Sequence, residues 1–442
     1  SPDVSPIRMD AVPHGHASMD FIGLGNVINF NARDLLGRFY DLRYEASEND
    51  LMKNYGIEED IKTFYAKANI DLDMTDTIRL RGNVGVRVVR TENSAKGYLV
   101  YPNNAFAPYL GSGQSEPISA ENSYTDVLPS ANVKWEPAEN WIVRFAASKA
   151  IARPAFSDMQ AYQVLSVAVR DGVTTVPGQT LGPDQLDLTG SSTDNPYLTP
   201  MKANQFDLSL EWYFAPDKGG MAWVNFFYKD IKDYFRQQTE LVPYPGVDGN
   251  QYDYLVSRLV NVGTAKIQGA EIGWNQFFDF LPAPFDGFGM SANYTYIDSS
   301  TRIPNASNAV PVDTDGSLFD DLPADGLSKN SYNVAAFYEK GPWQIRLAYN
   351  WRSEYLLSIG PNGYNGGDGG IAWKLPVYSD DFGQLDGSIF FKFNENFQIG
   401  LEANNLNNAE QRTLMDQNGA GKRVTSWFVN DRRYALTLRA TF

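Results

Sequence analysis

The stretch QFDLSLEWYF at residues 205–214 alternates apolar and polar side chains along most of its length. The apolar positions are Phe206, Leu208, Leu210, Trp212 and Phe214, and the polar ones are Gln205, Asp207, Ser209 and Glu211. An α-helix would bring apolar residues back every three or four positions, whereas a period of two places them on one side of an extended chain. The stretch therefore predicts a β-strand with one apolar and one polar face.

The same alternation recurs about thirteen times, for example in WQIRLAYNWR at 343–352 and FQIGLEAN at 397–404. We predict strands at 61–74, 77–92, 122–137, 140–152, 202–216, 219–233, 258–281, 285–298, 328–340, 342–354, 382–394, 396–408 and 431–442. Strands of soluble proteins usually have about 5 or 6 residues. These longer segments match tilted strands that cross a membrane and project beyond it.

The connections between these strands alternate between short and long. The short ones are turn-like, as at 137–140 and 339–342. The long ones, rich in Gly, Asn, Asp, Pro and Ser, are at 93–121, 153–201, 234–257, 299–327, 355–381 and 409–430. A membrane barrel has tight periplasmic turns at one end and extracellular loops at the other, whereas soluble propellers and sandwiches have no reason for this alternation. We therefore predict an all-β fold, a transmembrane antiparallel β-barrel in the cell outer membrane.

Composition excludes several other classes. The 442 residues contain no run of about 18 apolar residues, which excludes a helical membrane span. With no cysteine and only two histidines, His14 and His16, the chain can form neither disulfides nor thiolate sites, and His-rich zinc sites or Ser-His-Asp triads are close to impossible. A net charge of −16 argues against a nucleic-acid partner. We expect no catalytic residues, no metal and no cofactor.

The end of the chain adds a further signal. RRYALTLRATF at 432–442 alternates and closes on Phe442. An ordinary edge strand would explain it, but it resembles the C-terminal signal of outer-membrane barrels, which also end in a strand closing with Phe.

Several segments resemble the TonB-dependent receptor family, in particular a branch associated with carbohydrate uptake. They are LRGNVGVRVVRTE (80–92), LPSANVKWEPAENWIVRFAASKAIARPAFSDM (128–159), NPYLTPMKANQFDLSLEWYF (195–214), FFYKDIKDYF (226–235), NVGTAKIQGAEIGWNQ (261–276), GFGMSANYTYIDSS (287–300) and LEANNLNNAEQR (401–412). Their order and spacing, rather than any single piece, carry the resemblance.

This resemblance implies a barrel of about 22 strands around an N-terminal plug domain. The thirteen predicted strands would then be the last ones of that barrel. The chain departs from the family because it contains no plug-like segment and no Ton box, so we interpret it as the C-terminal part of a longer receptor. Residues 58–442 form this barrel portion, and 1–57 form a loop-rich segment with one further barrel strand expected around 27–44.

Two sets of residues are candidates for function. Charged residues on the polar faces would line the lumen and hold the plug, although any wet barrel has polar inward positions. They are Arg79, Arg81, Arg87, Arg144, Asp207, Glu211, Glu271, Arg346 and Glu402. Aromatic residues of the long loops would stack on a ligand, although aromatics near strand ends also form membrane girdles. They are Tyr101, Tyr109, Tyr162, Tyr355, Tyr364, Trp373 and Trp427.

One further motif is weaker. Residues 313–321, with Asp313, Asp315, Asp320 and Asp321, faintly resemble a calcium loop but lack its twelve-residue pattern. We expect a solvated acidic loop there.

By the same resemblance, the protein would be an outer-membrane receptor that imports a scarce extracellular ligand, with the TonB complex acting through the missing plug. Its partners would be the lipid bilayer, the TonB complex and a small-molecule or oligosaccharide ligand. A carbohydrate is favoured and a ferric siderophore comes next, because iron chelates are commonly anionic and the chain is acidic. The alternatives are a passive porin, which predicts a complete barrel in one chain, and a secreted all-β glycoside hydrolase, which predicts irregular loop lengths.

Overall fold

The protein is described here from a computed structural model covering residues 15–18, 26–29, 54–176, 178–191, 195–216, 219–302, 312–319, 322–360, 365–368 and 371–441. The chain divides into two compact units, Ser1–Asn54 and Tyr55–Phe442. In the first unit, β1 (Gly15–Ser18) and β2 (Asn26–Asn29) pair as an antiparallel ladder. The barrel strand expected around 27–44 lies almost wholly outside the described residues, as do His14 and the acidic pair Asp320 and Asp321.

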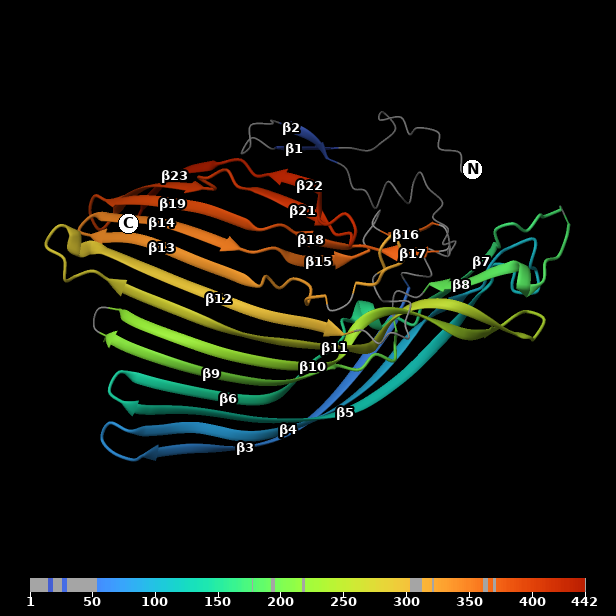
Figure 1. Ribbon diagram of the computed structural model, residues 1–442, viewed down its shortest axis with the longest axis horizontal. Helices are drawn as coiled ribbons and strands as arrows, with labels where there is room; N and C mark the ends of the chain where they lie inside the picture. Colours follow the sequence, from blue (N-terminus) through green and yellow to red (C-terminus); the bar gives the residue numbers. More distant parts are fainter. Residues whose placement is uncertain are drawn as a thin grey trace. The chain divides into compact units, whose positions relative to one another are not determined.

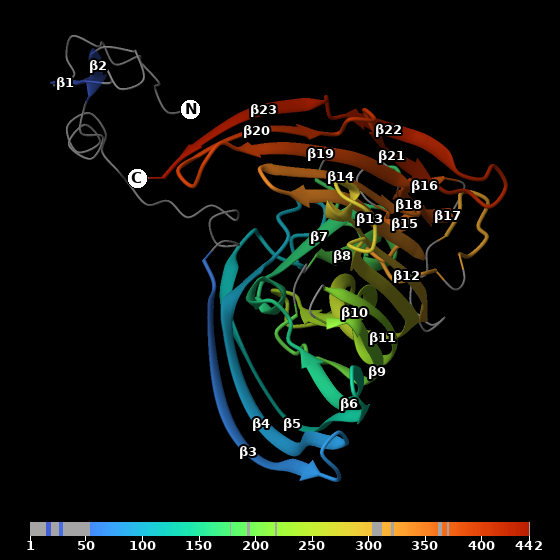
Figure 2. The same ribbon diagram turned by 90° about the vertical axis from the view of Figure 1, so that its left-hand side faces the viewer.

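The second unit is built on thirteen long strands that pair antiparallel with their neighbours (Figure 1). They are β3 (Gly56–Asp73), β4 (Arg79–Val100), β5 (Ser115–Ala138), β6 (Trp141–Ala152), β9 (Met201–Ala215), β10 (Gly220–Pro245), β11 (Gln251–Phe277), β12 (Phe288–Arg302), β13 (Asn330–Lys340), β14 (Trp343–Arg352), β19 (Phe382–Lys392), β20 (Phe397–Asn404) and β23 (Arg433–Ala440), in that order across the sheet. Each corresponds to one predicted strand, which confirms the predicted fold class. The sheet curves into an open arc, since no pairing of described residues joins β3 to β23 (Figure 2).

The strand register places apolar residues on one face and polar residues on the other. Leu208 on β9 lies opposite Phe145 on β6 and Phe226 on β10. Its neighbour Ser209 lies opposite Arg144 and Asn225. Large apolar side chains on the first face remain exposed, with Phe145 at 44% and Leu208 at 38%. Such exposure is costly in water but is what a lipid-facing surface requires.

Rings gather at the short-turn end of this apolar face. Trp141 stacks on Trp212 with 5.6 Å between ring centroids, and Trp343 meets Phe391 edge-on at 4.7 Å. Farther along the strands, Tyr332 stacks on Trp351 at 5.1 Å. Two aromatic belts that bracket an apolar band are typical of an outer-membrane barrel. The described part of the chain contains no helix with the length and apolarity that a membrane span needs.

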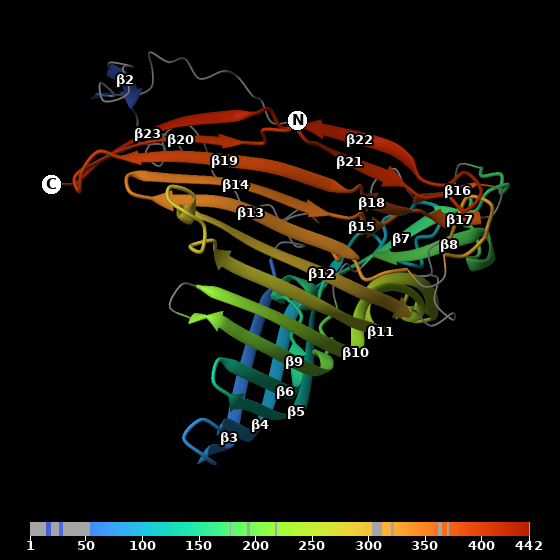
Figure 3. The ribbon, with the colours of Figure 1, turned by 60° about the vertical axis from the view of Figure 1, so that its left-hand side comes forward.

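Short turns join the strands at one end of the sheet, and long segments join them at the other (Figures 1 and 3). The two residues Glu139 and Asn140 connect β5 to β6, and Asn140 has φ of 63°. Gly341 and Pro342 connect β13 to β14, and Gly341 has φ of 57°. Asparagine and glycine adopt such left-handed conformations more readily than other residues.

The long segments are more ordered than the sequence predicted, because they contain strands of their own. These are β7 (Gln163–Val169), β8 (Leu186–Ser191), β15 (Tyr355–Ile359), β16 (Asn365–Asp368), β17 (Ile371–Lys374), β18 (Pro376–Ser379), β21 (Glu410–Met415) and β22 (Arg423–Val429), with 3₁₀ turns η3 (Phe156–Met159) and η4 (Pro183–Gln185). A further 3₁₀ turn, η6 (Phe285–Gly287), lies in the turn between β11 and β12 at the opposite end. Several long strands also extend into this region. β10 was predicted to end at 233 but continues to Pro245, paired with the start of β11.

These segments pack into two caps at the long-segment end of the sheet. The first cap, from residues 99–118, 163–176, 178–191 and 242–256, buries Tyr101, Leu165, Tyr254 and Val256. The second cap, from residues 312–319, 322–324, 355–360, 371–379 and 410–429, buries Leu356, Leu375, Tyr378 and Leu414. The best-packed apolar cores among the described residues therefore lie beyond the barrel wall, since the wall itself is one sheet thick.

Candidate functional site

The charged residues predicted to face the lumen all lie on the polar face of the sheet, as the register requires. Arg81 on β4 lies opposite Lys134 on β5 and Asp71 on β3. Arg346 lies opposite Ser388, which in turn lies opposite Glu402. The alternation of the sequence decides this orientation, because one residue of slip would move every side chain to the other face.

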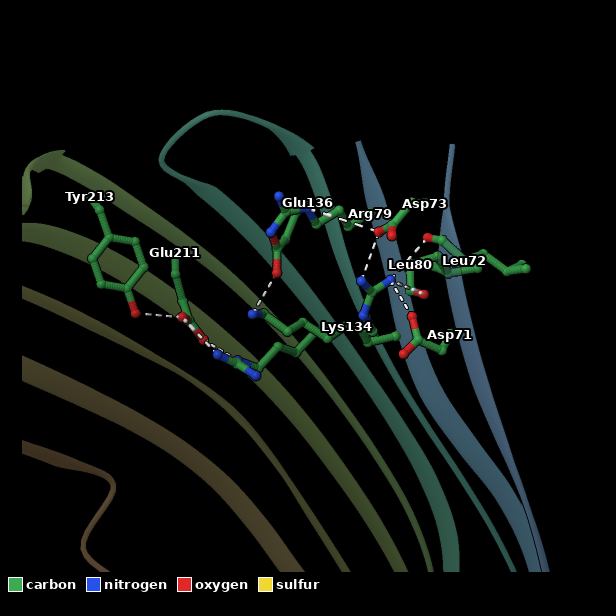
Figure 4. A network of polar contacts seen from close by, with 11 residues as sticks. Asp71, Leu72, Asp73, Arg79, Leu80, Lys134, Glu136, Glu211 and Tyr213 are labelled. Atoms are coloured by element: carbon green, nitrogen blue, oxygen red, sulfur yellow. Dashed lines mark hydrogen bonds and ion pairs between the residues drawn. The ribbon is translucent and has the colours of Figure 1, made fainter. Parts of the chain in front are cut away.

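Near the short turns these residues form two ionic clusters (Figure 4). In the first, the Arg81 guanidinium lies 2.7 Å from carboxylate oxygens of both Asp71 and Asp73. Beside it, the Lys134 ammonium lies 2.6 Å from Glu136. The opposite charges come from adjacent strands or from positions two apart on one strand, which are the positions that share a face.

The second cluster joins three residues of β6 and β9 (Figure 4). Arg144 donates from Nε to Oε1 of Glu211 over 2.6 Å, and a second guanidinium nitrogen lies 3.4 Å from Oε2. The Tyr213 hydroxyl donates to the same Oε2 over 2.8 Å. The Glu211 side chain is only 13% exposed, so this carboxylate is well shielded for a group on an open wall.

The two clusters border a hollow of about 970 Å³ on the polar face. Its lining combines cations, carboxylates and amides. The polar members are Arg81, Asn83, Asn132, Lys134, Arg144, Asp207, Ser209, Glu211, Asn225, Lys229 and Glu271. Such a surface can bind polar chain segments or solutes by hydrogen bonds and ion pairs.

The hollow brings together five of the nine predicted lumen residues: Arg81, Arg144, Asp207, Glu211 and Glu271. Arg79 lies beside it, 3.9 Å from Asp73. Arg87, Arg346 and Glu402 lie elsewhere on the polar face, and Glu402 accepts a hydrogen bond from Thr437. The sequence prediction missed Lys134 and Lys229, although the alternation of their strands places both on the inward face.

The aromatic residues predicted to bind ligand are in varied surroundings. Tyr101 and Tyr162 are 5% and 6% exposed, and Tyr109 donates to the carbonyl oxygen of Leu181 over 2.9 Å within the first cap. Their rings are therefore largely occupied by protein, and a ligand role for them stays a prediction. Trp427 is 66% exposed on β22.

The other aromatic candidates belong to the second cap or its base. Trp373 packs against the buried cluster of that cap. The Arg352 guanidinium lies 4.7 Å from the ring centroid of Tyr355, which is half-buried. Tyr364 lies outside the described residues. Trp373 and Tyr101 therefore belong to two different buried clusters.

The second cap also contains an electrostatic cluster. The Lys422 ammonium lies 3.9 Å from the ring centroid of Tyr378 and 2.6 Å from Glu354. Burial raises the pKa of the Tyr378 hydroxyl to about 12. Burial also raises the pKa of the Asp416 carboxyl above its usual range, while Lys422 opposes that shift.

In the segment that resembles a calcium loop, Asp313 and Asp315 accept hydrogen bonds from nearby residues. Asp313, which is 2% exposed, accepts from the backbone N–H of Thr314 over 2.6 Å and from that of Asn418 over 2.5 Å. Asp315 accepts from the N–H and hydroxyl of Ser317. The bonds from Asn418 to Asp313 and Ser317 tie the loop at 312–319 to the one at 416–419.

The sequence matches the family described as TonB dependent receptor-like, beta-barrel over residues 13–406. No curated protein matches it. Among solved structures, the chain is similar to the ferric-catecholate import receptor Fiu from Escherichia coli K12, with 15% identity, a TM-score of 0.50 and coverage of 87% of this chain and 45% of that one.

A second similar structure is a mutant of the ferric enterobactin receptor from Pseudomonas aeruginosa in complex with enterobactin. It has 14% identity, a TM-score of 0.50 and coverage of 87% of this chain and 55% of that one. The chain therefore spans about half the length of these structures. At such low identity the likeness concerns the fold alone.

Proposed function

Because the chain belongs to the TonB-dependent receptor β-barrel family, we propose that it forms the C-terminal wall of a receptor that imports a scarce extracellular ligand by TonB-coupled transport. Family membership also gives its location, the outer membrane of a Gram-negative cell. The observation that carries the proposal is the curved sheet of thirteen long antiparallel strands, apolar on its outer face and charged on its inner face.

The dimensions of the apolar face support a role as a membrane wall. On β14 the belts are marked by Trp343 and Trp351, eight residues apart. At about 3.3 Å per residue and a tilt of about 40°, this spacing gives a height of roughly 20 Å, close to the apolar band of about 25 Å in outer-membrane barrels.

In this proposal the polar hollow beside Arg81, Arg144 and Glu211 contacts a plug domain supplied by the remainder of the receptor. Its mixture of charges and amides suits many polar contacts of moderate strength. A plug held this way can be displaced when the TonB complex pulls on it from the periplasm. No bond is made or broken in the ligand, so this role requires no catalytic residue.

We propose a carbohydrate as the favoured ligand class and a ferric siderophore as the second. The six long extracellular segments contain 20 acidic and 9 basic residues. A field of that sign repels anionic iron chelates and is neutral towards uncharged sugars. The similar solved structures are siderophore receptors that share the fold, so a ferric siderophore is the second candidate ligand.

The test is uptake by cells that express the full receptor, with and without TonB. Labelled oligosaccharides and ferric siderophores are offered in parallel at limiting concentration. Accumulation of one class that disappears without TonB supports the proposal and identifies the class. Accumulation that persists without TonB and rises linearly with concentration would instead establish a passive porin.

A secreted glycoside hydrolase remains the least favoured alternative. It would release reducing sugar from an oligosaccharide without membranes. The strict placement of large apolar side chains on an exposed face argues against it, because a secreted protein would have to keep that face in water.

A further inference from the structure

A second hollow lies on the opposite, lipid-facing side of the sheet, at the short-turn end of β12, β13 and β14. It has a volume of about 400 Å³, within the range of about 300–1,000 Å³ that is usual for ligand sites. We call it the lipid-side groove and define it by Phe285, Phe288, Ala336, Tyr338, Ile345 and Leu347. Nothing in the proposed transport mechanism uses it.

The strand register explains why this surface is hollow. Phe288, Tyr338 and Ile345 lie in one row across the three strands. In the next row, Ala336 lies opposite Leu347. The small alanine between large neighbours leaves a trough in the surface.

One wall of the groove is held in place by the turn between β11 and β12. The Phe285 ring stacks on Phe288 with 6.2 Å between centroids, and Phe288 meets Tyr338 at 4.8 Å. The Tyr338 hydroxyl donates to the carbonyl oxygen of Pro284 over 3.1 Å. These contacts fix the turn beside the sheet, so the groove is a built feature and not a chance gap between side chains.

The position of the groove determines what can fill it. It opens towards the hydrocarbon of the bilayer, where water has no polar partners. An empty hollow would forfeit the dispersion contacts of its lining. An acyl chain is the only abundant group at that depth that can supply them.

Charges at the end of the groove add a second element of recognition. Lys340, two residues after Tyr338 on the same strand, forms an ion pair with Asp286, which follows Phe285. Both side chains remain about one third exposed. An ammonium has three donors and a carboxylate about four acceptor sites, so each group can bind another partner. An adjacent cation and anion match the phosphate and ammonium of a zwitterionic head group.

We propose that the lipid-side groove binds one phospholipid of the periplasmic leaflet with a zwitterionic phosphoethanolamine head group. One acyl chain fills the groove, the phosphate contacts Lys340 and the ammonium contacts Asp286. The periplasmic leaflet is chosen because the groove lies at the short-turn end, which faces the periplasm in outer-membrane barrels. The proposal requires only the outer-membrane location and is independent of which ligand the receptor imports.

The test is native mass spectrometry of the whole receptor, purified from outer membranes in a mild detergent. Phosphatidylethanolamine and phosphatidylglycerol with identical acyl chains are titrated in turn. We expect one retained phosphatidylethanolamine, lost in Ala336→Trp, which fills the groove. Ala292→Trp, on the outward face of β12 but outside the groove, is the matched control and keeps the lipid.

Two conservative variants test the head group without altering the groove. Asp286→Asn should lower the preference for phosphatidylethanolamine over phosphatidylglycerol about two- to fivefold, the range of one partly exposed ion pair. Lys340→Gln should weaken binding of both lipids by a similar factor of about two to five. Equal lipid retention in Ala336→Trp and Ala292→Trp would overturn the proposal. An unchanged preference in Asp286→Asn, or a retained adduct with the mass of lipopolysaccharide, would do so as well.

Discussion

Leu347 offers the sharpest test of which face of the sheet meets lipid. It lies on β14 midway between Trp343 and Trp351 and is 46% exposed on the apolar face. With a rise of about 3.3 Å per residue and a tilt of about 40°, it is about 10 Å below one aromatic belt and about 10 Å above the other. It therefore lies near the middle of the bilayer.

Replacing Leu347 by Arg should destabilise the folded receptor by about 2–4 kcal/mol, the cost of a cation at the midplane of a barrel. That free energy corresponds to a loss of about 30- to 700-fold in the folding equilibrium. The next residue, Ala348, faces the polar side, where it lies opposite Asp386. Ala348→Arg places the same cation in the wet interior beside a carboxylate and should cost less than about 1 kcal/mol.

The assay is guanidinium titration of the receptor in lipid vesicles, in which the shift of the midpoint multiplied by the slope gives the change in free energy. Both variants carry the same new side chain at adjacent positions, so differences in size and charge cancel. Equal costs for the two variants, or a larger cost for Ala348→Arg, would refute the assignment of the faces.

Three further predictions concern the inner wall and the second cap. Glu211→Gln removes the negative charge that pairs with Arg144. Because Arg144 is 47% exposed, the free energy of unfolding should fall by only about 1 kcal/mol in the same titration. A decrease several times larger would contradict this prediction. Asp313→Ala removes the carboxylate that accepts a hydrogen bond from the backbone N–H of Asn418. Protease should therefore cut the intact receptor within residues 409–430 several times faster than the wild type. Cutting at the wild-type rate would contradict a stabilising role for this hydrogen bond. Burial raises the pKa of the Asp416 carboxyl. The free energy of unfolding should therefore fall as pH rises from the unfolded pKa of 3.8 through the raised folded pKa. Asp416→Asn should flatten this fall in melting temperatures measured over a pH series, and an unchanged pH profile would contradict the prediction.

The strands could be predicted from the sequence because a membrane wall has one apolar and one polar face along its whole length. The orientation of Leu208 and Ser209 can be predicted without knowing which strands they pair with. The prediction failed where the alternation breaks. Asp233 has φ of 60°, and the register of β10 shifts between Lys232 and Tyr234. This bulge reverses the parity of the residues that follow, so the continuation to Pro245 did not resemble a strand.

The ends of other strands show the same dependence on local conformation. We predicted the penultimate strand to continue to 408, but β20 ends at Asn404. Asn405 and Asn408 have φ of 57° and 52° and turn the chain away. Asparagine tolerates this conformation, but it also occurs in strands, so the sequence signal for the turn was weak.

The candidate ligand residues were harder to predict for a different physical reason. Inside the caps the partners are distant in sequence: β8 pairs in parallel with β11, and β18 pairs with β21. Tyr101 is aromatic within a polar segment, which predicts a ligand contact. The same property suits it to the core of a cap that distant segments complete. Whether a loop aromatic is offered to a ligand or buried therefore depends on long-range pairing, which no local pattern encodes. The barrel wall lacks this ambiguity. One face of each strand contacts lipid and the other contacts the wet lumen, so the alternation of apolar and polar residues alone predicts the orientation of each side chain.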